Sequence, residues 1–113
     1  MDGLLTYYNM DSGGAVPIEY FSPMIVVVVA SSSDRILTLP DFVVGDVGKR
    51  LTVLKYGIGK VTLQAYTDVS IQDSGAGDTI YCDDGGMARI ELEIIDETQM
   101  SIIGGIGNWT TTN

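Results

Sequence analysis

Hydrophobic and polar residues alternate with a period of two in several parts of the chain. Residues 61–66 place Val61, Leu63 and Ala65 on one face of an extended segment. Residues 89–94 alternate in the same way, with apolar side chains on one face and mostly charged side chains on the other. Successive side chains of a β-strand point to opposite faces, so this pattern predicts strands with one buried face.

Looser alternation marks residues 35–39 and 51–56, and shorter apolar runs surround Ile71 and Ile80. Glycine and aspartate cluster between these runs and predict turns, because both residue types tolerate or stabilise turn conformations. No segment keeps a helical period, and at most one helical turn is expected, in residues 41–47. Short strands at close spacing predict an all-β single domain, an antiparallel β-sandwich or jelly roll.

The longest apolar run lies in residues 24–30, with the sequence MIVVVVA, and opens the predicted sandwich domain of residues 24–113. Four consecutive valines do not alternate, so both faces of this strand must be covered. Two covers remain open: a loop of the same chain, or a second subunit.

A second subunit is the favoured cover because the mean hydropathy of +0.23 is high for a small soluble monomer. An exposed apolar edge of this kind would also promote aggregation. We therefore expect the chain to assemble with itself, as a trimer in the favoured case and as a dimer in the alternative. The expected oligomer interface consists of Met24, Ile25, Val26, Val27, Val28 and Val29.

The N-terminal segment, residues 1–23, is less regular because Gly13-Gly14 and Pro17 interrupt it. It is either an arm that docks on a neighbouring copy or a larger assembly, or the first strand or strands of the same domain. Aromatic side chains are favoured in protein interfaces. The candidate docking residues of this segment are Tyr7, Tyr8, Tyr20 and Phe21.

Composition and charge argue against several functional classes. The 113 residues carry a net charge of -9, whereas a nucleic-acid-binding protein needs cationic side chains that displace counterions from phosphates. Histidine is absent and Cys82 is the single cysteine, which argues against His-based catalysis, disulfides and Cys-clustered metal sites. The sequence contains neither a signal peptide nor an apolar run long enough to cross a bilayer. We therefore expect synthesis in a cytoplasm and no membrane partner.

The acidic residues suggest two kinds of site, and neither pattern is specific. Asp73, Asp78, Asp83 and Asp84 lie in glycine-rich loops of the kind that can supply oxygen ligands to calcium, but the spacing of a calcium loop is missing. They are interpreted as turn-forming residues, with no bound metal. The glutamates of residues 89–94 are interpreted as a polar outer face. We therefore expect neither enzymatic activity nor a cofactor, and we expect Cys82 to be buried as a small apolar residue.

Trp109 and the six tyrosines leave one further alternative open. Aromatic side chains of a β-sandwich can stack on sugars, so a carbohydrate-binding module is a candidate function. The same residue types are also favoured on strands and in interfaces for packing alone.

The last two thirds of the chain contain short motifs in a characteristic order. They are ILTLP at 36–40, GKRLTV at 48–53, VTL at 61–63, TI at 79–80, the alternating strand at 88–95 and GNW at 107–109. This order resembles that of the small β-rich domain of tail fibres, head fibres and other surface proteins of tailed bacteriophages. In that family the tryptophan usually precedes the last strand, whereas Trp109 follows it here.

The resemblance implies a structural protein of the virion, assembled in the host cytoplasm, with no catalytic residues. The small size favours an oligomeric capsid decoration subunit, of the cement or head-fibre type, over a receptor-binding fibre tip. Its expected partners are other copies of itself and the major capsid protein or another virion protein. The alternative is a small tail or tail-fibre component.

Overall fold

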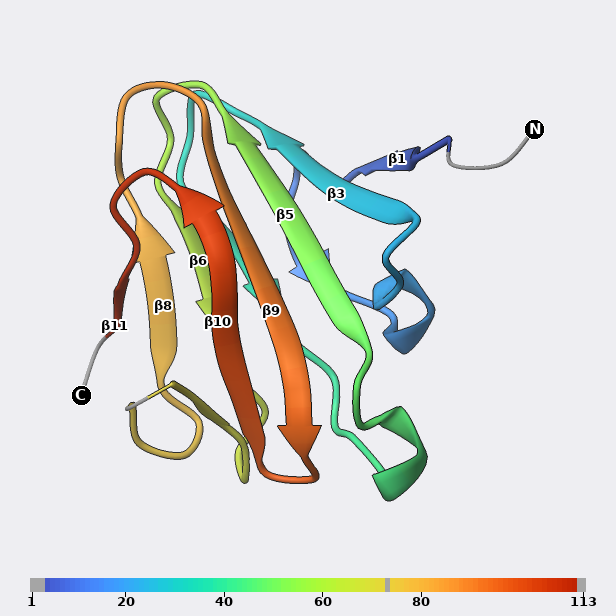
Figure 1. Cartoon of the computed structure of the whole chain (residues 1–113). Coiled ribbons are helices and arrows are strands. Elements are labelled where there is room, and N and C mark those ends of the chain that lie inside the picture. The colour runs from blue at the N-terminus through green and yellow to red at the C-terminus, as the bar shows by residue number, and fades with distance from the viewer. Residues whose placement is uncertain (1–3, 73, 112–113) are drawn as a thin grey trace.

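The computed structural model describes residues 4–72 and 74–111, and it consists of two β-sheets (Figure 1). The six-stranded sheet contains, in spatial order, β1 (Thr6–Asn9), β3 (Ile25–Ala30), β5 (Arg50–Tyr56), β9 (Ala88–Asp96), β10 (Gln99–Ile106) and β7 (Ser70–Ile71). The five-stranded sheet contains β11 (Thr110–Thr111), β8 (Thr79–Cys82), β6 (Val61–Gln64), β4 (Arg35–Thr38) and β2 (Gly14–Ala15). Two short 3-10 helices, η1 (Ile18–Tyr20) and η2 (Val44–Asp46), complete the fold. The predicted all-β single domain is confirmed.

The first half of the chain winds in a solenoid-like manner. Consecutive strands alternate between the two sheets, so that β1, β3 and β5 lie in one sheet and β2, β4 and β6 in the other. Each strand pairs in parallel with the strand two places earlier in the chain. The expected antiparallel sandwich or jelly roll is therefore wrong, because the strands of this half wind between the sheets and pair in parallel. Parallel neighbours need a long connection, and here the strand of the opposite sheet supplies it.

The direction of pairing changes in the second half. Strand β8 pairs antiparallel with β6, and β9 pairs antiparallel with β5. Strand β10 then folds back on β9 as an antiparallel hairpin, and β7 pairs in parallel with the far edge of β10. Figure 1 shows β9 as a long strand between β5 and β10 in the six-stranded sheet.

The hydrophobic core lies between the two sheets. Ile90, Leu92 and Ile94 of β9 point into it and are at most 1% exposed, as the alternation predicted. From the other sheet, Val61 and Leu63 of β6 meet them in the same cluster of buried residues. Burying such side chains contributes roughly 1.5–3 kcal/mol each relative to leaving them exposed. The single predicted helical turn in residues 41–47 is also present, as η2.

The valine run of β3 is covered on both faces, as predicted. Val27 and Val29 belong to the core, whereas Val26 and Val28 lie on the opposite face of the strand and are each 7% exposed. Val26 lies in register beside Tyr7 of β1 and Val28 beside Asn9, because β1 pairs in parallel with β3. Residues 1–23 thus contribute strands to the same two sheets, through β1 and β2.

Candidate assembly surface

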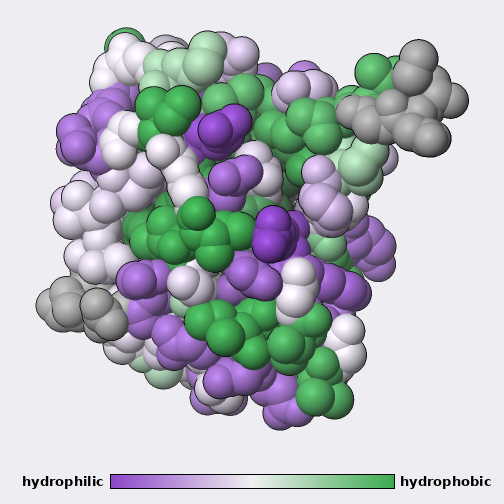
Figure 2. Space-filling model, in the orientation of Figure 1, coloured by the Kyte–Doolittle hydropathy of each residue, from purple (hydrophilic) through white to green (hydrophobic). Residues whose placement is uncertain are grey.

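A short loop at one end of the six-stranded sheet carries exposed valines. We call Val43, Val44 and Val47 the valine tip; their side chains are 64%, 72% and 45% exposed. The valine tip surrounds η2, which Figure 1 shows beside the end of the sheet where β9 turns into β10. Figure 2 shows apolar surface at the same lower end of this face. Exposed apolar side chains that gather in one place are a frequent mark of a protein-binding site.

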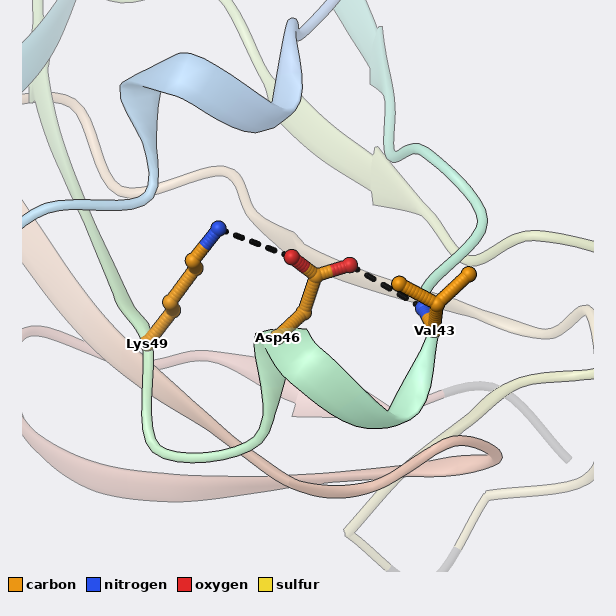
Figure 3. Close-up of polar contacts among 3 residues, drawn as sticks. All are labelled: Val43, Asp46 and Lys49. Atoms are coloured by element: carbon orange, nitrogen blue, oxygen red, sulfur yellow. Dashed lines mark hydrogen bonds and ion pairs between the residues drawn. The ribbon is translucent and has the colours of Figure 1, made fainter.

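Asp46 holds the valine tip in shape. Its Oδ2 accepts a hydrogen bond from the Val43 N–H at 3.0 Å, and its Oδ1 lies 2.8 Å from the Nζ of Lys49, which donates to it (Figure 3). The Lys49 hydrogen bond, followed by the Val43 N–H, lowers the pKa of the Asp46 carboxyl below 3.8. The loop therefore presents its valines from a defined backbone conformation.

The valine tip is also tied to β9 and bordered by acidic residues. The Gly48 N–H donates to the Ile94 carbonyl at 2.8 Å, and the Ile94 N–H donates to the Lys49 carbonyl at 2.9 Å. A shallow hollow of about 350 Å³ is lined by Val44 and Val47 together with Asp96, Glu97 and Thr98 of the β9–β10 turn. Apolar and acidic side chains thus share this end of the molecule.

The outer face of the six-stranded sheet contains a groove. It has a volume of about 420 Å³, and a second hollow of about 210 Å³ adjoins it through shared lining residues. We call the two together the outer-face groove; its large apolar side chains are Leu5, Tyr7, Val26, Leu54, Met87 and Ile106. They come from β1, β3, β5, β10 and the chain around them, so only the folded sheet brings them together.

Two opposite charges lie in the outer-face groove. Arg89 and Glu91 occupy outward positions of β9, in register with Leu54 and Thr52 of β5. In the described part of the chain the only ion pair joins Lys49 to Asp46, so neither Arg89 nor Glu91 takes part in one there. Both side chains still contact water, Arg89 as an exposed residue and Glu91 as a half-buried one.

The interface expected from the sequence is only partly accessible. Val26 to Val29 are at most 7% exposed in the single chain, which leaves them little surface to offer a partner. Ile25 is half-buried and Met24 is 42% exposed. The chain itself supplies the cover of β3, so any seam has to use the residues around this strand.

The aromatic residues expected to dock are divided between core and surface. Phe21 is 4% exposed and packs edge-on against Phe42, with ring centroids 5.7 Å apart, so it is a core residue. Tyr8 and Tyr20 stack on each other with ring centroids 4.6 Å apart. Tyr7 is 57% exposed and lines the outer-face groove. Tyr7 is therefore the member of this set that a partner would contact most fully.

The acidic loop residues serve as turn and loop contacts. Asp78 accepts a hydrogen bond from the Gly75 N–H at 2.8 Å, and Asp84 accepts one from the Asn108 N–H at 2.9 Å. The Asn108 N–H is the main reason why the pKa of Asp84 is lowered. Asp83 is exposed, and Asp73 lies outside the described residues. Among the described residues, no three His, Cys, Asp or Glu side chains lie close enough to hold a metal ion.

Cys82 and Lys55 are both buried, and the sequence predicted the burial of Cys82 alone. Cys82 is buried as predicted, and burial raises the pKa of its thiol, which keeps it protonated and unreactive. Lys55 is fully buried, and its Nζ donates to the carbonyls of Gly57 at 2.8 Å and of Asp84. The alternation of β5 indicates the burial of Lys55, because Lys55 lies at an inward-facing position of that strand.

Trp109 is held against the body of the protein. Its indole N–H donates to the Arg89 carbonyl at 3.0 Å, and its ring packs on the core as a partly buried side chain. A flat platform for sugar stacking needs an open ring face, which Trp109 offers only in part.

Comparison with known proteins adds no relative. No protein-family model matches the chain, and no characterised protein matches its sequence at a significant level. No helix in the described ranges is long and apolar enough to cross a bilayer.

Proposed function

We propose that this chain is a structural subunit of a tailed-bacteriophage virion, an oligomeric capsid decoration subunit of the cement or head-fibre type. It acts by burying its own surface against copies of itself and against the capsid. It needs no substrate, metal or cofactor.

The observation that carries the proposal is the valine tip. Val43, Val44 and Val47 are exposed on a loop that Asp46 and the backbone of β9 hold in one conformation. Removing apolar surface from water is favourable by roughly 25 cal/mol for each Å² buried, so covering this loop stabilises the complex with a partner. A loop fixed before binding also loses little conformational entropy on docking.

Two further features support a role in a protein shell. The order of short motifs from ILTLP to GNW resembles that of surface domains of tailed phages. The net charge of -9 keeps free subunits apart in solution until specific contacts form.

Labelling of virions tests the proposal. Antibodies raised against the purified chain are applied to tailed-phage particles whose genome encodes it, and the label is located by electron microscopy. Label on the head facets is the expected result, and label on the tail would replace the decoration role by the alternative of a tail or tail-fibre component. Particles that bind no more antibody than an unrelated phage would overturn the virion assignment.

A further inference from the structure

The molecule carries a convex apolar feature and a concave one at different places on its surface. The valine tip projects beside the end of the six-stranded sheet, and the outer-face groove lies on the face of that sheet. Figure 2 shows hydrophilic side chains between the lower apolar patch and the upper part of this face. The two features are therefore separate surfaces of the chain.

We propose that the valine tip of one copy docks into the outer-face groove of the next copy, head to tail. This inference rests on the proposed function in that it takes the chain to be an assembly subunit, and it names the partner of the exposed surfaces as a second copy of the chain.

Apolar character matches on the two sides. Val44 is the most exposed member of the valine tip at 72%, and Met87 in the groove wall is 60% exposed. Leu54 and Met87 both line the two hollows of the groove. Covering both surfaces at once removes two apolar areas from water, whereas a polar partner would cover either one without this gain.

Charge also matches. Asp96 and Glu97 border the valine tip, whereas Arg89 lies in the groove without an ion pair in the described residues. Glu91 lines the groove too, but its Oε1 lies over Gly104 of β10, on the side of β9 away from β5. Docking brings Asp96 and Glu97 toward Arg89. Such local attraction selects one orientation between two chains that otherwise repel each other.

The geometry of the contact determines the kind of assembly. A contact that joins one tip to one groove is heterologous, and it leads to a ring if the rotation between copies closes. A closed ring agrees with the trimer favoured by the sequence analysis, and it leaves no tip or groove exposed. A twofold dimer would instead have to seat the tip of each copy in the groove of the other at the same time.

Sedimentation of purified variants tests this contact. The wild-type chain is expected to sediment as a closed oligomer at micromolar concentration. Val44→Lys changes the tip alone and Met87→Glu changes the groove alone, and each is expected to sediment as a monomer. Ile36→Lys, at a 56% exposed position of β4, is the matched control and should remain oligomeric. Circular dichroism and the urea midpoint verify that all three variants fold.

Mixing the two defective variants gives the decisive result. The Val44→Lys chain keeps its groove and the Met87→Glu chain keeps its tip, so an equal mixture is expected to form a heterodimer through one intact contact. A mixture that stays monomeric, or a Val44→Lys chain that still forms a dimer, would overturn the head-to-tail contact. So would a monomeric wild-type chain.

The outcome separates this inference from the proposed function. A monomeric chain that antibodies nevertheless locate on virions would leave the virion role standing but remove both the head-to-tail contact and the self-association. If mixing the two variants restores an oligomer but the chain is never found on particles, the head-to-tail contact would stand and the proposed function would be removed.

Discussion

The side-chain oxygen of Gln72 accepts a hydrogen bond from the backbone N–H of Ile102 at 2.7 Å. Gln72 follows β7, whose pairing with β10 ends at Ile71 and Met100. Its side chain thus extends the pairing beyond the last backbone contact, next to the irregular register after Ile102. Gln72 also has a φ of 56°, in the left-handed region that L-residues rarely adopt.

At position 72 a glycine variant should be more stable than an alanine variant, which is the reverse of the usual order. Both Gln72→Ala and Gln72→Gly lose the bond to Ile102, which costs about 1 kcal/mol. Glycine adopts a positive φ without the Cβ penalty, so the glycine variant is expected to be more stable than the alanine variant by about 1 kcal/mol. Urea unfolding of the two variants measures this difference. Equal stabilities, or a more stable alanine variant, would contradict the φ assignment.

Two adjacent glycines of β10 should respond differently to alanine. A Cβ at Gly105 would lie 2.4 Å from the Arg89 carbonyl oxygen, which is backbone, and the residue has a φ of 155°. A Cβ at Gly104 would meet only the flexible end of Glu91, at 2.5 Å from Oε1. Gly105→Ala is expected to destabilise the fold by about 2–4 kcal/mol, because β9 and β10 must separate locally.

Gly104→Ala is the matched control for this prediction. Its Glu91 carboxylate can move, so the loss is expected to stay below about 1 kcal/mol. Thermal or urea unfolding of both variants gives the comparison. Similar losses at the two positions would show that the close approach at Arg89 is not the determining contact.

The strands and their buried faces could be predicted from the sequence, but their pairing could not. Alternation in β6 and β9 identifies which side chains point inward, because period two is a property of a single strand. The same alternation fits parallel and antiparallel neighbours equally well. The winding of β1 to β6 depends on where each connection delivers the chain, and short loops rich in glycine and aspartate give no sign of a change of sheet.

The candidate surface was harder to predict than the fold. Val43 and Val44 have the residue type of a core, and only the Asp46-centred loop turns them outward. The valines of β3 have the same composition but are buried, so hydrophobicity alone pointed to the wrong part of the chain for exposed surface. The groove escapes prediction for another reason, since it combines side chains from strands that only the sheet order makes neighbours.

Lys55 should be needed for stability although it is a buried cation. Lys55→Met keeps the length of the side chain but removes the donor to the carbonyls of Gly57 and Asp84. Leaving buried acceptors without a partner costs about 1–3 kcal/mol each, so a loss of about 2–4 kcal/mol is expected in urea unfolding.

Lys60→Met is the control for the buried lysine. The Lys60 ammonium lies 5.3 Å from the centre of the Tyr81 ring, a contact worth at most about 1 kcal/mol at a partly exposed site. An equal loss in both variants, or a Lys55→Met variant as stable as the wild type, would contradict the structural role of the buried ammonium.

Two aspartates should make the fold sensitive to acid. The pKa of Asp46 is lowered by Lys49 and the Val43 N–H, and that of Asp84 mainly by the Asn108 N–H. The unfolded chain therefore takes up these protons at a higher pH than the folded chain does. The stabilisation is fully present above the ordinary value of 3.8 and is lost as the pH falls through the lowered folded-state values.

The corresponding measurement is the urea midpoint as a function of pH, from about 7 down to about 2. The double variant Asp46→Asn and Asp84→Asn is expected to lose less stability over the acidic part of this range than the wild type, because it has no carboxyl to protonate at either position. Glu19→Gln, at an exposed position of η1, is the control and should keep the wild-type slope. A double variant whose midpoint falls as steeply as that of the wild type would show that other carboxyl groups determine the acid sensitivity. Because Asp46 also holds Val43, the same acid range should loosen the valine tip and weaken the contact between copies. An association limited only by the net charge of -9 would instead become stronger in acid, because protonation removes the repulsion between copies.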